Sequence, residues 1–492
     1  MKNRKFNLLK DASLLVFIIL INFSCEREVS DDATIATFPT TAEIFTDSPI
    51  GMGTNFYFPY GPDELNPIGS KLNAWTVDDN VSYVGNASMR FDVPSSNDPE
   101  GNYAGAIFRT EGAGRDLTGY DALTFWAKAS QGVTVGEFGF GEDFFPNKYI
   151  TTVKNVSIGT TWKKYIIPIP DASKLIQERG MFRYSAGTQA TNGSGYTFWI
   201  DELKFEKLGT IGQPRPSIAN GVNKTVSSFI GVTIPIEDLK ETFNMPSGLD
   251  QDVFPAPGYF VFKSSNPNVA TVDESGRITV VGSGTAIVTA NIGGSLDAST
   301  NEFVGGLNSI DSITVNSLGV FSLPPTPTRD PSKVLSIFSD SYTNVPVAYY
   351  NGFWTPGSTT GSADFTINNN NFLNYTTFNY VGIATSNPTL NASTMTNIHF
   401  DMYIPGNVPS NFDFLISIED WGPNQVDNGN PQDDTRQQIF VPRSQVQPNT
   451  WITIEAPLTL VNRNNIGLII MENINGSSLS NFYMDNIYFY RP

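Results

Sequence analysis

The chain has little of the chemistry that most hydrolases use. Its single cysteine, Cys25, excludes a disulfide within the chain, and its single histidine, His399, lies in the strand-like stretch "TNIHFDMYI". Neither a G-x-S-x-G nor an H-E-x-x-H motif occurs. Two adjacent acidic pairs stand at 142–143 and 419–420, but neighbouring side chains on a strand point to opposite faces. Because a glycosidase needs two carboxylates around one bond, we expect a protein that is not an enzyme.

Basic residues are scarce, and this narrows the choice of partner. The 30 lysines and arginines stand against 48 acidic residues, a formal net charge of −18 at pH 7. Such a surface argues against a nucleic-acid partner. It also repels sulfated or uronate-rich polymers, so a polysaccharide ligand is expected to be neutral.

The composition favours β structure over helices. The sequence has 42 glycines, 32 prolines and many short runs of Val, Ile, Thr, Tyr and Phe. A chain of 492 residues is too long to fold around a single hydrophobic core, so its length indicates several domains. We therefore expect an all-β, multidomain protein.

The first 25 residues predict export and lipidation. "MKNRKFNLLKDASLLVFIILINFSC" has a basic start, an apolar centre and a small residue before Cys25. This pattern resembles a bacterial lipoprotein signal peptide (1–24), although Asn22 stands where Leu is usual; an ordinary signal peptide or a short anchor is the alternative. The acidic segment 25–40 is then expected to be a lipidated flexible tether that holds the protein at the outside of the outer membrane.

The remainder contains an internal repeat at domain scale. "EIFTDSPIG" at 43–51 matches "SIFSDSYTN" at 336–344, and "YTFWIDELKFEK" at 196–207 matches "SNFYMDNIYFYR" at 480–491. Each copy contains short alternating strands closed by turn residues, which is typical of a two-sheet sandwich or jelly roll. We expect such modules at 41–208 and 333–492.

The segment between the copies has another pattern. "SSNPNVATVDESGRITVVGSGTAIVTA" at 264–290 resembles the bacterial immunoglobulin-like domain of group 2, so 213–316 is expected to be an immunoglobulin-like spacer. The Pro-rich stretch 317–332 is expected to be a stiff linker.

The combination "IFSDSYTN", "NGFW", "FLNYTTFNYVGI" and "FYMDNIYFY" resembles jelly-roll carbohydrate-binding modules in surface glycan-binding lipoproteins of Bacteroidota polysaccharide-utilisation loci, the laminarin type above all. The resemblance implies a monomer that binds a neutral β-1,3-glucan outside the cell for degradation and uptake, beside an outer-membrane glycan transporter complex. It covers the last domain better than the first, so residues 330–492 are expected to hold most of the affinity. A structural or adhesive surface protein is the alternative.

Exposed rings are the expected sugar contacts, because a ring that covers the apolar face of a pyranose contributes about 1–2 kcal/mol. In the last module the candidates are Trp354 in a Gly/Pro-rich loop, Trp421 where a strand enters a loop, and Tyr375. Asp420 beside Trp421 is either a hydrogen-bond acceptor for sugar hydroxyls or a loop cap. Trp354 is either a platform or a plug at the end of the sandwich.

In the first module the candidates are Phe144, which the repeat aligns with Trp421, together with Tyr57 and Trp75. Tyr57 belongs to the aromatic stretch "TNFYFPYGP", whose alternative role is a small hydrophobic core. Trp126, Trp162, Trp199 and Trp451 lie in alternating strands and are expected to be buried.

The repeat also places paired aspartates near the ends of each module. Asp47 with Asp201, and Asp340 with Asp485, occupy equivalent positions near the first and last strands. Carboxylates are ligands that Ca²⁺ prefers, and modules of the resembled kind often hold a structural calcium there. The alternative is that Asp201 and Asp485 turn outward from an edge strand.

Overall fold

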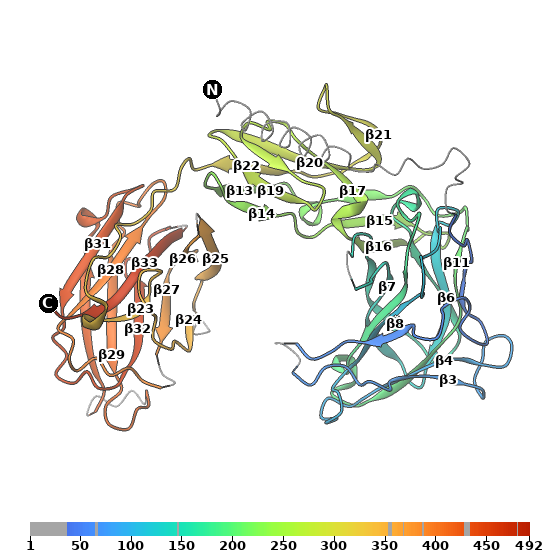
Figure 1. The fold of residues 1–492 in the computed structure, drawn as a ribbon, viewed down its shortest axis with the longest axis horizontal. Coiled ribbons are helices and arrows are strands. Elements are labelled where there is room, and N and C mark those ends of the chain that lie inside the picture. Colours follow the sequence, from blue (N-terminus) through green and yellow to red (C-terminus); the bar gives the residue numbers. More distant parts are fainter. Residues whose placement is uncertain are drawn as a thin grey trace, which may run out of the picture.

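The computed structural model describes residues 37–63, 67–144, 147–352, 357–367, 369–385, 388–427, 433–479 and 481–492. Their regular structure consists of strands and short 3-10 helices, so the predicted all-β, multidomain fold is confirmed. The domains form an arch, with a sandwich at each end and the middle domain at the top (Figure 1). The described residues contain no helix with the length and hydropathy needed to cross a membrane.

The first domain is a sandwich of two antiparallel sheets. One sheet has the order β3-β4-β11-β6-β9, with β1 beside β11. The other runs β2-β5-β10-β7-β8. The strands are β1 (Glu43–Phe45), β2 (Tyr57–Pro59), β3 (Trp75–Asp78), β4 (Ser88–Val93), β5 (Ala104–Arg109), β6 (Ala122–Ala129), β7 (Val133–Phe140), β8 (Thr151–Ile158), β9 (Lys163–Pro168), β10 (Gly180–Ala186) and β11 (Tyr196–Glu206).

The last domain repeats this topology strand for strand. Its sheets run β25-β26-β33-β28-β31, with β23 beside β33, and β24-β27-β32-β29-β30. The strands are β23 (Val334–Phe338), β24 (Tyr349–Gly352), β25 (Gly361–Ile367), β26 (Asn370–Thr376), β27 (Tyr380–Ala384), β28 (Asn397–Tyr403), β29 (Phe414–Asp420), β30 (Thr435–Val441), β31 (Trp451–Pro457), β32 (Ile466–Asn473) and β33 (Asn481–Tyr490). The sequence repeat is therefore a structural repeat.

The middle domain shares a sheet with the first. Strand β16 (Asp250–Pro255) pairs with β8, and β15 (Lys240–Asn244) and β12 (Arg215–Ser217) continue outward from it. The rest forms two small sheets: β13 (Lys224–Ser228), β22 (Ile313–Ser317), β20 (Thr285–Asp297), β17 (Phe260–Ser264) and β21 (Glu302–Asn308), against β14 (Thr233–Pro235), β19 (Arg277–Val280) and β18 (Ala270–Val272). Continuous strand pairing makes this junction a hydrogen-bonded sheet rather than a linker.

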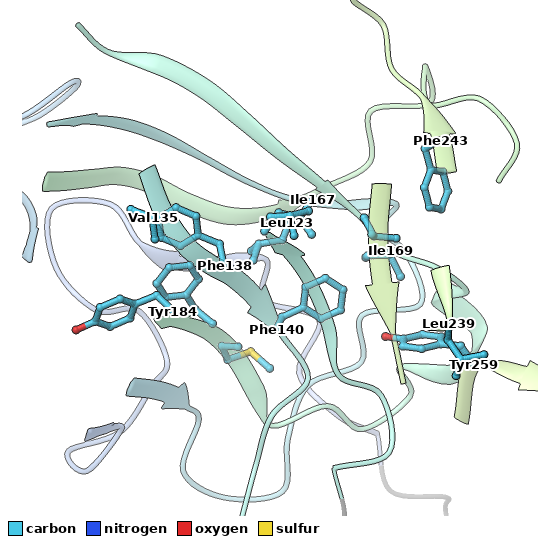
Figure 2. Close-up of a cluster of buried hydrophobic side chains, with 14 of the residues drawn as sticks. Leu123, Val135, Phe138, Phe140, Ile167, Ile169, Tyr184, Leu239, Phe243 and Tyr259 are labelled. Atoms are coloured by element: carbon cyan, nitrogen blue, oxygen red, sulfur yellow. The ribbon is translucent and has the colours of Figure 1, made fainter. Parts of the chain in front are cut away.

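Hydrophobic packing reinforces that junction. Leu239, Phe243 and Tyr259 of the middle domain are buried in the same cluster as Phe140 and Ile169 of the first, as Figure 2 shows. The Tyr259 hydroxyl, inside this cluster, donates to the backbone carbonyl of Tyr149 at 2.9 Å. One core thus spans both domains.

The last domain is fixed to the middle one by a separate cluster, which we call the Phe321 cluster. Phe321 of the linker and Phe229 of the middle domain pack on the outer face of the sheet that contains β26, β28 and β33. Its other members are Phe365, Ile367, Phe372, Tyr403 and Tyr483, with Trp451 at its edge. The indole nitrogen of Trp451 also donates to the backbone carbonyl of Ser322. This packing holds the linker against the last domain.

The shared core contains an unpaired acid. Glu241 of β15 is fully buried, and neither of its carboxylate oxygens has a hydrogen-bond partner among the described residues. Burial, with the nearby charge of Asp171, raises its pKa well above the usual value. The unfolded chain releases this proton at about pH 4.3, so the contribution of Glu241 to folding stability is most favourable below that pH and is lost as pH rises toward its raised folded-state pKa.

We predict that Glu241→Gln stabilises the protein at pH 7 by roughly 1–3 kcal/mol, because glutamine has no charge in the unfolded chain and so removes the cost of protonating the buried acid on folding. Thermal unfolding of both proteins between pH 4 and pH 8 measures this. The difference should shrink toward pH 4, where Glu241 is protonated in both states. A constant difference across the range would contradict the assignment.

Candidate functional site

A groove of about 1250 Å³ opens at the outer face of the β2-β5-β10-β7 sheet of the first domain. Strand alternation explains its lining, because Phe108, Phe182 and Tyr184 point into the core and leave the residues between them outside. The groove is lined by Tyr60, Gly61, Asp63, Ser96, Asn102, Tyr103, Glu137, Arg183, Ser185, Gly187, Thr188, Gln189, Asn192 and Gly193. Rings and hydrogen-bonding groups therefore share one open surface.

Two tyrosine rings rest on the backbone of β5. A side chain at Gly105 would come within 2.8 Å of the Tyr60 ring and 3.0 Å of the Tyr103 ring. The missing side chain lets both rings approach the strand. Burial raises the pKa of the Tyr60 hydroxyl, so it stays a neutral hydrogen-bonding group at physiological pH.

Ion pairs fix the polar groups of the groove. Arg183 of β10 contacts the carboxylates of Glu137 at 2.8 Å and Glu142 at 2.5 Å. Glu142 also accepts a hydrogen bond from the Tyr60 hydroxyl at 2.8 Å. A network with several partners holds these side chains in one orientation. The groove is thus preorganised.

A second aromatic patch lies next to this network on the same sheet. Phe144, which is 52% exposed, stands edge-on to Phe58 with a centroid distance of 4.8 Å. The Arg109 guanidinium lies 4.7 Å from the Phe144 centroid and pairs with Asp143. Of the predicted contacts in the first domain, Phe144 is therefore the one at an exposed position.

The other two predicted contacts of the first domain are partly buried against the core. The rings of Tyr57 and Trp75 lie 5.3 Å apart, and each lies within 5.5 Å of Phe108. Both pack against the buried core. These contacts leave both rings partly buried and favour the alternative of a small hydrophobic core, while their role as glycan contacts stays a prediction.

In the last domain the described residues predicted to contact the glycan are buried or half-buried. Asp420 is buried, and its oxygens accept hydrogen bonds from the backbone N–H groups of Gly422 and Asn465, so it caps the loop. Trp421 follows the end of β29 as predicted and is half-buried, with its ring against Gly467. Tyr375 is 1% exposed and donates to the carbonyl of Tyr350, so its prediction as a surface contact is wrong.

Trp354 and Cys25 lie outside the described residues. The glycan platform at Trp354 and the lipid at Cys25 therefore stay predictions. Exposed rings of the last domain are found elsewhere, at Tyr349 on β24 and Phe440 on β30, which are 39% and 53% exposed.

The aspartates of the first domain bind backbone groups. Asp201 accepts from the N–H groups of Tyr83, Val84 and Glu202, and Asp47 accepts from those of Asn86 and Ala87. These bonds fix the loop 79–87. Because backbone donors occupy the carboxylates, this pair is a poor calcium site, and the structure gives it another role.

The equivalent aspartates of the last domain face a small pocket. The pocket has a volume of about 60 Å³ and is lined by Asp340, Asp485 and Asn486 together with linker residues 323–327. Burial, then the charges of Asp340 and Asp401, raises the pKa of Asp485 to about 7. In the described residues no three His, Cys, Asp or Glu side chains are grouped for a metal. Asp340 accepts hydrogen bonds from the backbone N–H and the side-chain amide of Asn371, so a cation here would have to displace these donors. It would also need carbonyl oxygens as well as the two carboxylates.

Sequence reasoning missed Tyr103, Glu137, Arg183 and Gln189. A signal existed for Arg183, since "MFRYSAG" alternates large apolar and polar residues and β10 exposes the polar ones. Tyr103 and Gln189 precede or follow strands, and only the folded chain brings them to one groove. Tyr60, weighed with its aromatic stretch, does lie in the groove.

Comparison with known proteins places the first domain in a class. Residues 42–207 match the family model of carbohydrate binding domain 30, and residues 257–293 match that of the intimin immunoglobulin-like domain. No curated protein matches the chain. The first match concerns carbohydrate binding and not catalysis, and it supports the interpretation of the first domain as a carbohydrate-binding module. The immunoglobulin-like middle domain is likewise supported.

Solved structures with similarity include the family 30 module of a cellulosomal cellulase of Clostridium thermocellum, at 20% identity over 34% of this chain and 96% of that chain, with a TM-score of 0.25. A family 11 module of the same organism, solved with a β-1,3-1,4-mixed-linked tetrasaccharide, has 20% identity over 32% and 94%, with a TM-score of 0.23. A tandem of family 22 modules from Paenibacillus barcinonensis has 10% identity over 93% and 99%, with a TM-score of 0.22.

Proposed function

We propose that the protein binds a neutral polysaccharide, a β-1,3-glucan of the laminarin type first, in the groove of its first domain and does not cleave it. The observation that carries this is the groove itself, where Tyr60 and Tyr103 lie beside a fixed network of hydrogen-bonding groups. Sugars present an apolar ring face and polar edges, so such a surface suits them.

The first domain takes the principal role in this proposal, although the sequence resemblance favoured the last. Two observations support the change: the family match falls on residues 42–207, and the groove lies there. The negative net charge supports a neutral ligand. In the groove the arginine pairs with acids, which leaves little free positive charge for an anionic polymer.

The proposal also places the protein at the cell surface, anchored through Cys25, as a monomer that captures glycan beside an outer-membrane transporter. Its support is the signal-like sequence of residues 1–25. We expect Cys25→Ser to move the protein from the membrane fraction to the soluble fraction of its host and to abolish labelling with a fatty-acid analogue. If the Cys25→Ser variant were labelled as strongly as the wild-type protein, the proposed lipid anchor at Cys25 would be contradicted.

The principal test is Phe144→Ala, which removes the exposed ring of the aromatic patch beside the groove. We expect about tenfold weaker binding to laminarin, the equivalent of about 1.4 kcal/mol, with an unchanged melting temperature. Calorimetry with the full chain measures the affinity, and affinity electrophoresis compares laminarin with alginate.

Phe440→Ala is the matched control, because Phe440 is exposed to the same degree on the equivalent sheet of the last domain. It should leave the affinity unchanged. A loss in Phe440→Ala but not in Phe144→Ala would return the site to the last domain. Strong binding of alginate without binding of laminarin would refute the neutral ligand.

For calcium, we propose one structural ion in the last domain, between Asp340 and Asp485. The two carboxylates and linker residues 323–327 line one pocket there, and carboxylate oxygens are hard ligands that suit Ca²⁺. An ion in that position would join the linker to the last strand. It would stabilise the fold without contacting the groove of the first domain.

We predict that chelation lowers the melting temperature and that calcium restores it, while laminarin binding persists. An ion present at 100 times its dissociation constant stabilises by about 2.7 kcal/mol. Asp485→Ala should lower the melting temperature and remove the effect of chelator. If chelator leaves the melting curve of the wild-type protein unchanged, the proposed calcium site is refuted.

A further inference from the structure

The first domain carries a second aromatic surface on its other sheet. Trp126 of β6, Trp199 of β11 and Trp162, which precedes β9, are half-buried rather than enclosed. Their prediction as core residues is wrong, because Leu123, Phe125 and Phe198 take the inward positions and turn Trp126 and Trp199 outward. We call Tyr83, Trp126, Trp162 and Trp199 the tryptophan platform.

The rings of the platform form a connected surface. Tyr83 stacks on Trp126 with a centroid distance of 3.8 Å and an interplanar angle of 14°. Trp162 lies 6.0 Å from Tyr83. The Lys128 ammonium lies 5.5 Å from the Trp162 ring and 5.2 Å from the Trp199 ring. Tyr83 is 38% exposed, so the stack is open to solvent.

Fixed polar groups border the rings. The Trp199 indole donates to Asp78 at 2.9 Å, and the Thr197 hydroxyl donates to Asp92 at 2.7 Å. Arg90 pairs with Asp92 at 3.0 Å. Asp201 holds the backbone of Tyr83 and Val84, so the uppermost ring of the stack is positioned before any ligand arrives. The result is a preorganised surface of rings with hydrogen-bonding groups at its edge.

In the last domain, the face of the sheet that corresponds to the tryptophan platform is covered by another part of the protein. By strand order and by the sequence repeat, Trp162, Trp199 and Lys128 correspond to Trp451, Tyr483 and Tyr403. Those three belong to the Phe321 cluster, where Phe229 and Phe321 cover them. The covered face has a tyrosine where the platform has a lysine. A cation and ion pairs suit a wet, polar ligand better than a second hydrophobic domain.

We propose that the tryptophan platform is a second carbohydrate-binding surface, which takes uncharged pyranose units and lies on the sheet opposite the groove. β6 and β11 lie at the outer side of the arch, whereas β7 and β8 lie toward the last domain (Figure 1). One domain would then hold two chains, or two segments of a branched chain. The ligand class rests on the proposed function; the site does not, since it shares no described lining residue with the groove.

The test uses the full chain with laminarihexaose, cellohexaose and an alginate hexamer as probes. In Phe144→Ala/Tyr60→Ala, which disables the groove, we expect residual calorimetric binding of a neutral hexaose. Adding Tyr83→Ala should weaken this binding about tenfold, and Tyr83→Trp should restore it. Val84→Ala is the matched control, because Val84 is an exposed neighbour in the same loop and should change nothing.

Tryptophan emission gives an independent measurement. The described lining of the groove contains no tryptophan, whereas the platform contains three. A neutral hexaose should change the emission of the groove variant, and Trp162→Phe should reduce that change by at least half.

The two proposals fail in different ways. If Phe144→Ala/Tyr60→Ala leaves laminarin binding intact while Tyr83→Ala weakens it, the groove proposal fails and the platform stands. If the groove variant binds no neutral hexaose, or if Tyr83→Ala and Trp162→Phe leave its binding and emission unchanged, the platform proposal is overturned. Preference for the alginate hexamer over both neutral hexaoses in the groove variant would overturn the ligand class.

Discussion

Each strand of a two-sheet sandwich gives every second side chain to the core, and only the alternate ones are left to build a surface. In the first domain, β10 buries Phe182 and Tyr184 and thereby exposes Arg183 to the groove. On the opposite sheet, β6 buries Phe125 and leaves Trp126 half-buried on the outer face. Both candidate binding surfaces are consequences of one packed core, and neither depends on a flexible loop alone.

The first and last domains have one topology but use equivalent positions differently. The last strand has a left-handed residue after its aspartate in both copies, Glu202 and Asn486, so the local bend is shared. In the first domain Asp201 binds the loop that carries Tyr83, whereas in the last domain Asp485 faces the linker. The equivalent carboxylate thus positions a surface ring in the first domain and lies against the linker in the last domain.

The two junctions of the arch explain how such a protein holds its surfaces apart. Pairing of β16 with β8 and a shared core unite the first and middle domains. The last domain is held by the Phe321 cluster, in which seven buried residues of two domains and the linker meet. Buried apolar contacts of this kind resist bending far better than a polar linker. The groove and the last domain therefore keep a defined separation.

The sequence by itself determined the β class, the repeat and the positions where strands end, because these depend on local composition and on residues close in the chain. Trp421 follows β29 and Phe144 lies beyond β7 as the repeat predicted. The exposure of individual rings was decided by tertiary structure. A period of two shows which residues share a face, but when both faces carry aromatics only the partner sheet determines which face is inside. Trp126, which the sequence predicted to be buried, is half-buried for that reason. The groove joins residues from β7, β10 and three separate loops that no local pattern links.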